Sequence, residues 1–461
     1  MSSGPSIFEV FAQALDERRI RVAGGSMDAL AVGGRLQALR SHPIESRESV
    51  GMVFENGPAC LENYLAFAFA DVVAVPLPPT LPDAERQRLW LSAGCRYYVD
   101  LEGVHPIPDA LDGVTRWPAG IHWVMHSSGS TGVPKAIPLT FEAVRRNAGD
   151  VMDLLGYGTD LVHLGSMSQC YTNGLFNSFL LPLLTGGKCV VGPVASALKV
   201  RQYLQLVRSE RPEILWVNPA VVSMLMRQGI PEDFTSVKAL ISCTAPLDAD
   251  LCRAAAAAFG RPVLQSFGTT ETLIVSVETP GRDARTHFSS GKIVGGRDAV
   301  VVGDDSVLRI QNGAVTPGYA TCSAGEVTMT LPDGGVPTQR FVSGDLAMLS
   351  ATGELHIIGR TTNVINVGGV KISAEQLEEV LRADPAVVEA AVTSLKLPDG
   401  GERPVAFVQA RAPIDKDRLI ETCVSRLGSK SRLADIHVVS ALPRTGNGKV
   451  DRGALMLKLG S

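Results

Sequence analysis

Short apolar runs alternate with segments of helical periodicity from about residue 50 onward. Short apolar runs between polar or turn residues are typical of buried strands, whereas longer amphipathic segments predict helices. The predicted strands are 72–75, 121–125, 189–191, 214–217 and 239–241, and the predicted helices include 198–209 and 248–259. Because strands and helices follow one another in turn, the pattern predicts parallel sheets covered by helices.

The pattern changes after residue 359. Ser373 followed by Gln376 has the spacing of a capping box, which predicts the start of a helix that runs to Leu381. Strands at 387–395, 405–410 and 436–439 and a helix at 416–427 are expected to follow. We therefore expect an α/β fold with a large N-terminal domain of helix-covered sheets, residues 1–359, and a small α+β C-terminal domain, residues 360–461.

Composition and charge narrow the class of protein. Hydrophobic residues make up 45% and charged residues 20% of the chain, as in ordinary globular proteins. The net charge is -4 and no basic block occurs, which argues against a nucleic-acid partner because phosphate binding needs a concentrated positive face. The sequence has neither a run of about 20 apolar residues nor an apolar leader. We expect a cytoplasmic protein without a membrane partner, whose 8 scattered cysteines are reduced and mostly buried.

A candidate phosphate-binding loop follows the predicted strand 121–125. It reads His-Ser-Ser-Gly-Ser-Thr-Gly-Val-Pro-Lys, from His126 to Lys135. Glycines let backbone N–H groups turn toward an anion, hydroxyls donate to phosphate oxygens, and a lysine neutralises charge. The segment has neither a Walker ending nor a dinucleotide fingerprint. Taken alone, it leaves a phosphate loop and a plain surface loop equally open.

Four further segments combine glycine with groups that bind nucleotides. Segment 267–271 places a hydroxyl and a carboxylate beside a glycine, and 343–346 has an acid directly after a glycine. Segment 359–363 begins Gly-Arg after a strand-like run, and 443–449 is a glycine-rich loop that ends in a lysine. Each segment by itself is more often a simple turn.

Together and in this order, the five segments resemble the adenylate-forming superfamily of acyl-CoA synthetases, nonribosomal peptide adenylation domains and beetle luciferases. The resemblance extends from about Val50 to Arg452, and its most specific parts are 127–135 and 443–449. It implies an acid–thiol ligase that activates a small carboxylic acid with ATP to an acyl-AMP and releases pyrophosphate. The acyl group would then pass to the thiol of coenzyme A or of a carrier-protein phosphopantetheine supplied in trans.

The resemblance also implies roles for individual residues. Lys449, Thr270 and Glu271 would be catalytic, with Glu271 binding Mg²⁺. Asp345 would bind the ribose hydroxyls and Arg360 the ribose or a phosphate. The remaining residues expected to bind ATP or AMP are Ser127, Ser128, Gly129, Ser130, Thr131, Gly132, Lys135, Thr244, Ala245, Pro246, Phe267, Gly268 and Thr269.

In this superfamily a mobile C-terminal domain rotates between the two half-reactions. The hinge would lie at Thr362, where the superfamily typically has Asp or Lys. Gly368, Gly369 and Lys371 would line the tunnel for the pantetheine thiol, although the two glycines can also form a simple turn before Ser373.

The expected acyl pocket contains Tyr171, Thr172, Leu175 and Cys243. Members that activate amino acids have Asp at the position of Tyr171, so the resemblance disfavours an α-amino acid and favours a small or aromatic acid. A tyrosine packed in the core is the alternative for this position. Two other functions stay open, a ligase that uses an amine acceptor or stops at the adenylate, and a non-catalytic nucleotide- or acyl-binding protein. The second is disfavoured because Lys135, Glu271 and Lys449 are all present.

Overall fold

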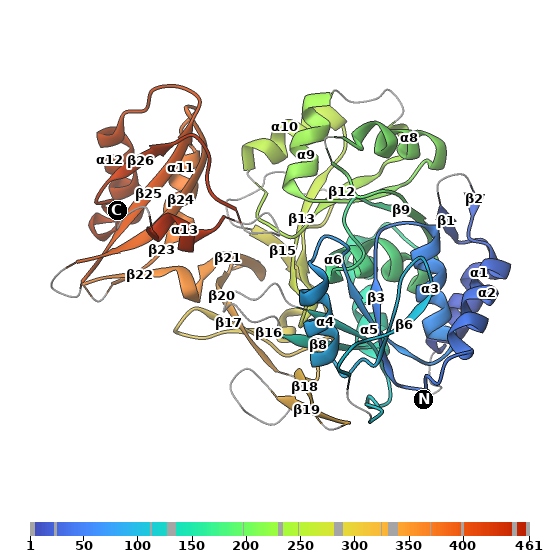
Figure 1. The fold of residues 1–461 in the computed structure, drawn as a ribbon. Coiled ribbons are helices and arrows are strands. Elements are labelled where there is room, and N and C mark those ends of the chain that lie inside the picture. Colours follow the sequence, from blue (N-terminus) through green and yellow to red (C-terminus); the bar gives the residue numbers. More distant parts are fainter. Residues whose placement is uncertain are drawn as a thin grey trace. The chain divides into compact units, whose positions relative to one another are not determined.

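The structure of the chain is a computed structural model (Figure 1). It describes residues 5–22, 25–110, 113–126, 135–196, 198–228, 234–247, 249–280, 289–323, 325–330, 340–368, 370–397, 401–444 and 450–457. The chain divides into two compact units. The large unit comprises Met1–Val301, Arg309–Phe341 and Ala351–Leu355, and the small unit comprises Val302–Leu308, Val342–Ser350 and His356–Ser461.

One sheet of the large unit is mostly parallel. Nine of its strands stand in the order β2 (Gly25–Ser26), β1 (Ile20–Val22), β10 (Lys188–Val191), β9 (Val162–Gly165), β11 (Ile214–Val217), β12 (Ala239–Ser242), β13 (Val263–Thr269), β14 (Leu273–Val277) and β15 (Ser289–Ile293). Neighbouring strands are parallel along the series β1, β10, β9, β11, β12 and β13. Strands β2, β14 and β15 pair antiparallel to their neighbours. The predicted strands 189–191, 214–217 and 239–241 are confirmed as β10, β11 and β12.

A second sheet of the large unit carries the strands on either side of the candidate phosphate loop. Its order is β19 (Glu326–Thr330), β18 (Tyr319–Ser323), β8 (Ala136–Thr140), β7 (Ile121–His126), β4 (Val73–Leu77), β3 (Ser49–Val53), β5 (Tyr97–Val99) and β6 (Val104–Pro106). The central strands β7, β4, β3 and β5 are parallel, and β8, β18, β19 and β6 pair antiparallel to their neighbours. The predicted strands 72–75 and 121–125 are confirmed as β4 and β7.

Helices cover these sheets because their apolar faces pack on the strands. They are α1 (Ile7–Asp16), α2 (Ala29–Arg40), α3 (Pro58–Phe69), α4 (Asp83–Ser92), α5 (Phe141–Leu155), α6 (Thr172–Leu175), α7 (Leu181–Leu184), α8 (Val200–Glu210), α9 (Pro219–Gln228) and α10 (Ala249–Phe259). One core packs Trp123, Phe179 and Trp216 together, and a second packs the first sheet against α8, α9 and α10, which lie together in Figure 1. Among the described residues, no helix combines the length and the apolar character needed to cross a membrane.

The small unit is α+β, as the sequence predicts. It contains β24 (Val387–Lys396), β25 (Glu402–Ala410) and β26 (Ile436–Val439) in one sheet, the hairpin of β22 (Val364–Val367) and β23 (Val370–Ser373), and the helices α11 (Ala374–Arg382), α12 (Lys416–Leu427) and α13 (Arg452–Leu457). Ser373 caps α11 by accepting from the amide of Gln376 at 3.4 Å, while its hydroxyl donates to Glu375 at 2.9 Å. The expected α/β fold class is therefore confirmed.

Two details differ from the sequence-based expectation. The sequence predicts that segment 267–271 follows a strand, but its first three residues belong to the strand, because β13 extends to Thr269 by pairing antiparallel with β14 across a register shift at Phe267 and Gly268. The expected boundary after residue 359 falls inside β21 (Glu354–Arg360). The small unit also takes in residues 342–350 of the neighbouring strand β20 (Phe341–Leu349) and the loop after it, so Asp345 and Arg360 belong to the same unit.

Candidate functional site

Several of the expected site residues lie outside the part of the chain that the structure describes. They are Ser127, Ser128, Gly129, Ser130, Thr131, Gly132, Gly369 and Lys449, and the side chain of Lys371. Their roles stay predictions from the resemblance. The other expected site residues are described, and they fall into groups in the two units.

The first group joins Lys135 to Glu271 in the large unit. Lys135 directly precedes β8, and its Nζ lies 4.4 Å from the centre of the Tyr319 ring. The Tyr319 hydroxyl donates to Glu271 Oε1 at 3.0 Å. Burial raises the pKa of Tyr319 well above its usual range, and the neighbouring Glu271 carboxylate adds to this shift. The structure thus brings the expected phosphate lysine and the expected metal-binding carboxylate to one tyrosine, which the sequence analysis did not identify.

Glu271 lies in a short turn between β13 and β14. The Thr269 and Thr272 hydroxyls are 3.0 Å apart, and the backbone N–H of Thr316 donates to the carbonyl of Glu271 at 2.7 Å. Gly268 is required by packing, since a Cβ atom there would lie 2.0 Å from the carbonyl oxygen of Leu273. Thr270, the expected partner of the α-phosphate, precedes Glu271 in this turn and is partly buried.

Segment 244–246, expected beside adenine, is exposed and shaped by a neighbouring glutamine. Thr244 has a φ of 75°, in the left-handed region that non-glycine residues rarely adopt. Gln265 Nε2 donates to the carbonyl of Ala245 at 3.2 Å, and its Oε1 accepts from the backbone N–H of Leu247 at 2.8 Å. Gln265 therefore holds this segment, and no motif in the sequence identified it.

Three of the four expected acyl-pocket residues lie in α6 or directly before it. Tyr171 precedes this helix and is 44% exposed, so it is not a core tyrosine. Burial of part of its side chain raises the pKa of Tyr171 to about 12, so its hydroxyl is neutral at physiological pH. Thr172 and Leu175 are buried.

Cys243 is linked to the segment that continues α6. This segment, Phe176–Leu180, forms one turn of π-helix, a feature that is frequent at functional sites. Asn177 within it is 1% exposed and donates from Nδ2 to Cys243 Sγ at 3.5 Å. Burial raises the pKa of the Cys243 thiol to about 12, so it is neutral. Asn177 is a pocket candidate that the sequence analysis missed.

Asp345 and Arg360 form the second group, in the small unit. Asp345 on β20 is 2% exposed, and its Oδ1 lies 2.8 Å from Nε of Arg360 at the end of β21. Thr361 Oγ1 donates to the carbonyl of Gly344 at 3.2 Å. Both residues expected at the ribose therefore lie on adjacent strands with their charges paired.

The expected hinge follows as a 3-10 turn, Thr361–Asn363, with Thr362 exposed. The Glu375 carboxylate accepts from the backbone N–H of Arg360 at 3.4 Å and from the side-chain amide of Asn363. The turn is thus held to α11 by Glu375, although Thr362 itself carries no charge.

Gly368 lies at the turn between β22 and β23, where Val367 pairs with Val370. Its φ of 58° is left-handed, which explains the need for glycine at this hairpin turn. The geometry is that of a simple turn, and a role in a thiol tunnel stays a prediction.

Two arginines hold the ends of the segment that contains Lys449. Arg444 forms an isolated β-bridge with Val450, and its Nη2 donates to both carboxylate oxygens of Glu389 at 2.7 Å. Arg452 Nη2 lies 2.5 Å from Oε1 of the buried Glu378. Arg444 and Arg452, which are described on either side of segment 445–449, are therefore bonded to β24 and α11.

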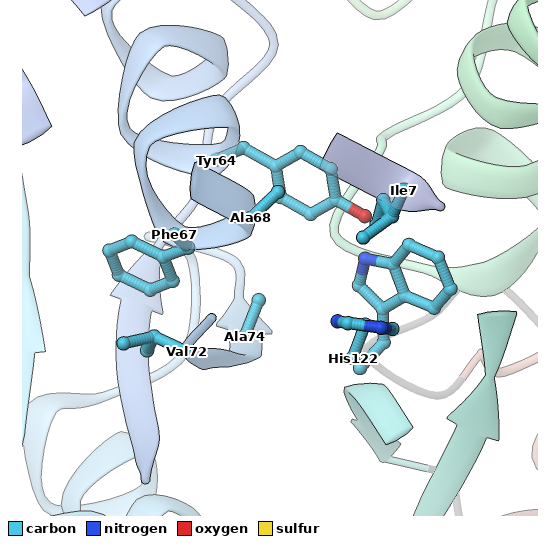
Figure 2. Close-up of a pocket in the computed structure, with 8 residues that line it drawn as sticks. Ile7, Tyr64, Phe67, Ala68, Val72, Ala74 and His122 are labelled. Carbon is cyan, nitrogen blue, oxygen red and sulfur yellow. The ribbon is translucent and has the colours of Figure 1, made fainter. Parts of the chain in front are cut away.

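A small cavity elsewhere in the large unit is not part of this site. Figure 2 shows it between Tyr64, Phe67 and Ala68 of α3 and the side chains of Ile7 and His122. Its volume is about 10 Å³, close to the smallest space that holds one water molecule. It cannot accept an acid or a nucleotide, and none of the expected site residues line it.

Known proteins resemble the chain in sequence over most of its length. The family described as AMP-binding enzyme matches residues 36–320, and the AMP-binding enzyme C-terminal domain matches residues 376–449. Pseudomonine synthase PmsE of Pseudomonas entomophila is 25% identical over 401 residues, which cover 84% of this chain and 63% of that protein. A 2-succinylbenzoate–CoA ligase of Listeria monocytogenes is 26% identical over 433 residues, which cover 92% of this chain and 87% of that protein.

The fold also resembles that of solved structures. ATP-bound MatB from Rhodopseudomonas palustris superposes with a TM-score of 0.81 at 22% identity, over 98% of either chain. The chain spans 63–66% of the length of pseudomonine synthase and of two further curated relatives.

Proposed function

Because the chain belongs to the AMP-binding enzyme family, we propose that it activates a carboxylic acid with ATP and then transfers the acyl group to a thiol. In the first step a carboxylate oxygen attacks the α-phosphorus of ATP. The bond from this phosphorus to the oxygen that bridges to the β-phosphate breaks, and pyrophosphate leaves with that electron pair. In the second step a thiol displaces AMP from the acyl-AMP and loses its proton.

The observation that carries this proposal is the cluster of Lys135, Tyr319 and Glu271. The first step brings an anionic nucleophile to a polyanion, so catalysis depends on positioning and on neutralisation of charge. Lys135 supplies a cation and Glu271 a carboxylate, and both contact the same tyrosine. Thr270, beside Glu271, would place its hydroxyl at the α-phosphate.

Glu271 is suited to hold Mg²⁺. This ion prefers oxygen ligands and usually takes one or two carboxylates together with substrate phosphates. Glu271 offers a partly buried carboxylate with one oxygen fixed by a hydrogen bond. When bound, Mg²⁺ would neutralise charge on the phosphates of ATP. The chain's own contribution is to hold this carboxylate in place.

In the small unit, Asp345 and Arg360 would take the ribose. The Asp345 carboxylate is suited to accept hydrogen bonds from the two ribose hydroxyls. Arg360 Nε lies 2.8 Å from Asp345 Oδ1 and so keeps the carboxylate in position. Lys449 would pair with the acid's carboxylate and the α-phosphate during adenylation. For the second step, Thr362 would serve as the hinge, and Gly368, Gly369 and Lys371 would approach the thiol arm.

We propose a small or aromatic acid as the substrate class. Tyr171 presents a neutral hydroxyl and a ring, and Cys243 and Asn177 add a neutral thiol and an amide. The ammonium group of an α-amino acid would lose its hydration on entering this site. Because Tyr171, Cys243 and Asn177 offer it no charged partner, binding would cost several kcal/mol. The relative from Listeria monocytogenes is named for an aromatic acid and for transfer to coenzyme A, which supports this class and this acceptor.

Pyrophosphate release across a panel of carboxylic acids, with and without coenzyme A, tests the proposal. We expect aryl or short acyl acids to stimulate release, and common α-amino acids to have little effect. Formation of an acyl-CoA would support the thiol acceptor, whereas amide formation with added amines alone would indicate an amine acceptor. A free amino acid as the best substrate, with that preference unchanged in Tyr171→Phe, would contradict the substrate class.

A further inference from the structure

We infer that Tyr319 is a positioning residue for nucleotide binding, whose hydroxyl orients the Glu271 carboxylate toward Mg²⁺ and whose ring holds Lys135 beside it. The inference rests on the proposed function, because that function assigns Glu271 to the metal and Lys135 to the phosphates. Neither the sequence motifs nor the relatives' names assign a role to Tyr319.

Both partners contact different parts of one side chain. The Tyr319 hydroxyl donates to Glu271 Oε1 at 3.0 Å, and Lys135 Nζ lies 4.4 Å from the ring centre. An ammonium over the face of an aromatic ring is attracted by the negative potential of that face. A single tyrosine can therefore set the positions of a cation and a carboxylate at the same time.

The strand pairing places Tyr319 where both contacts are possible. Tyr319 opens β18, which is antiparallel to β8, and Ala320 is the register partner of Ala136. In this antiparallel register Lys135 falls opposite Thr321, so Tyr319 is its diagonal neighbour, within reach of a long and an aromatic side chain. This pairing joins residues far apart in the sequence, and it depends on the second sheet being formed.

The loop before Tyr319 is tied to the same two elements. Thr316 is 3% exposed, its hydroxyl donates to the carbonyl of Pro138 on β8 at 2.6 Å, and its backbone N–H donates to the carbonyl of Glu271 at 2.7 Å. The loop before Tyr319 is thus held against β8 and against the Glu271 turn by Thr316, through contacts that do not involve the Tyr319 side chain. Replacing the tyrosine side chain should leave this framework in place.

The hydrogen bond from Tyr319 fixes the orientation of the Glu271 carboxylate. An ionised carboxylate accepts hydrogen bonds and does not donate them. A donor bonded to Oε1 therefore limits the rotation of the carboxylate group and fixes the direction in which Oε2 points. A tyrosine hydroxyl is a donor as well as an acceptor, and at 3.0 Å from Oε1 it donates to the carboxylate. A carboxylate that is oriented before the metal arrives loses less conformational freedom on binding it.

Two variants separate the hydroxyl from the ring. Tyr319→Phe removes the donor and keeps the ring over Lys135, whereas Tyr319→Leu removes both. Tyr157→Phe is the matched control, because Tyr157 is also partly buried in the large unit and its hydroxyl donates to a backbone carbonyl, that of Lys238, at 3.5 Å.

The measurement is ATP binding by calorimetry as a function of Mg²⁺ concentration, on the full chain and without acid. In Tyr319→Phe we expect the Mg²⁺ concentration for half-maximal binding to rise about five- to tenfold, as for loss of one hydrogen bond to a charged group. Affinity at saturating Mg²⁺ should change by less than about twofold in this variant, and Tyr319→Leu should weaken it further because Lys135 loses its support. Tyr157→Phe should match the parent protein.

A Tyr319→Phe variant with the parent's Mg²⁺ dependence would overturn the inference, even if its melting temperature were lower. The same shift in Tyr157→Phe would also overturn it, because the effect would then not be specific. If the parent protein itself shows no Mg²⁺-dependent ATP binding, the proposed function fails and the inference fails with it. The parent titration thus distinguishes failure of the proposed function from failure of the inference alone.

Discussion

Arg360 Nε lies 2.8 Å from Asp345 Oδ1, so the two side chains expected at the ribose of ATP are paired with each other. Asp345 is 2% exposed and the side chain of Arg360 is 46% exposed. The arginine therefore compensates a buried carboxylate while keeping part of its guanidinium accessible to solvent. The pair serves the fold of the small unit and, in the proposed function, keeps the Asp345 carboxylate in place for the ribose.

Arg360→Gln should lower both stability and nucleotide affinity. Removing the cation takes one charged partner from a buried carboxylate, but because Arg360 is half exposed we expect a loss of only about 1–2 kcal/mol in the free energy of unfolding. Chemical denaturation measures this loss, and ATP titration should show weaker binding. Arg88→Gln, which breaks an exposed pair with Glu85, should cost less than about 1 kcal/mol. An equally small effect of the two variants would contradict the role of the pair.

The sequence predicts most of the elements and the superfamily because both depend on local patterns. Buried strands such as Ile214–Val217 and capped helices such as Lys416–Leu427 have apolar spacing and end signals within a few residues. The adenylate-forming superfamily is confirmed by the matching families. The eight cysteines are free, and seven of them are buried, as expected.

The residues that hold the site are missed for a physical reason. Tyr319 and Glu271 are 48 residues apart, and their contact joins β18 of one sheet to the turn between β13 and β14 of the other. Gln265 and Glu375 likewise act through hydrogen bonds to other segments. No local spacing encodes such contacts, so the motifs identify the groups expected at the nucleotide and leave out the side chains that support them.

Lys449→Ala should reduce acyl-AMP formation by about a hundredfold or more, since it removes a cation from the charge that develops in the transition state. Rapid-quench measurement of acyl-AMP gives this rate directly. Lys396→Ala, on an exposed lysine at the end of β24, is the control and should match the parent protein. Adenylate formation at the parent rate in Lys449→Ala would show that the assigned role is wrong.

Arg452→Met should destabilise the protein in a way that depends on pH. Glu378 is 6% exposed, burial raises its pKa, and Arg452 offsets part of that rise. Without the arginine, we expect a loss of about 2–4 kcal/mol at pH 7. In the variant, the pKa of Glu378 in the folded state lies further above its unfolded value of 4.5. As the pH falls toward 4.5, Glu378 therefore takes up a proton in the folded state before it does so in the unfolded state, and the loss of stability becomes smaller.

Denaturation at several pH values measures this effect. The control is Arg444→Gln, because the pair of Arg444 with Glu389 is more exposed and should contribute less than about 1 kcal/mol. The double variant Arg452→Met with Glu378→Gln should recover much of the stability, since no buried charge remains. A loss that is the same at pH 7 and pH 5 would argue against an uncompensated Glu378 carboxylate.

His163 should make the large unit sensitive to mild acid. Its Nδ1 accepts from Trp216 Nε1 at 3.1 Å, and because an indole N–H only donates, the imidazole must be neutral. Burial lowers the pKa of His163 to about 3 from a usual 6.5. Between these values the unfolded chain binds the proton and the folded chain does not, so stability is full above pH 6.5 and falls as the pH drops.

The expected contribution of His163 is about 2 kcal/mol lost between pH 7 and pH 5. His163→Gln keeps a side-chain acceptor for Trp216 but does not titrate, so its unfolding free energy should fall less over the same interval. Denaturant titrations of both proteins at each pH measure the difference. Identical pH slopes for the variant and the parent protein would exclude His163 as the source.

The central claim is that the chain forms an acyl-AMP from ATP and a carboxylic acid. Adenylation is reversible while pyrophosphate is present, so an active protein should incorporate labelled pyrophosphate into ATP only when its acid is added. We predict such acid-dependent exchange with an aryl or short acyl acid, abolished in Lys449→Ala and strongly reduced in Glu271→Gln. Exchange that is absent for every carboxylic acid, in a parent protein that still binds ATP, would contradict the account.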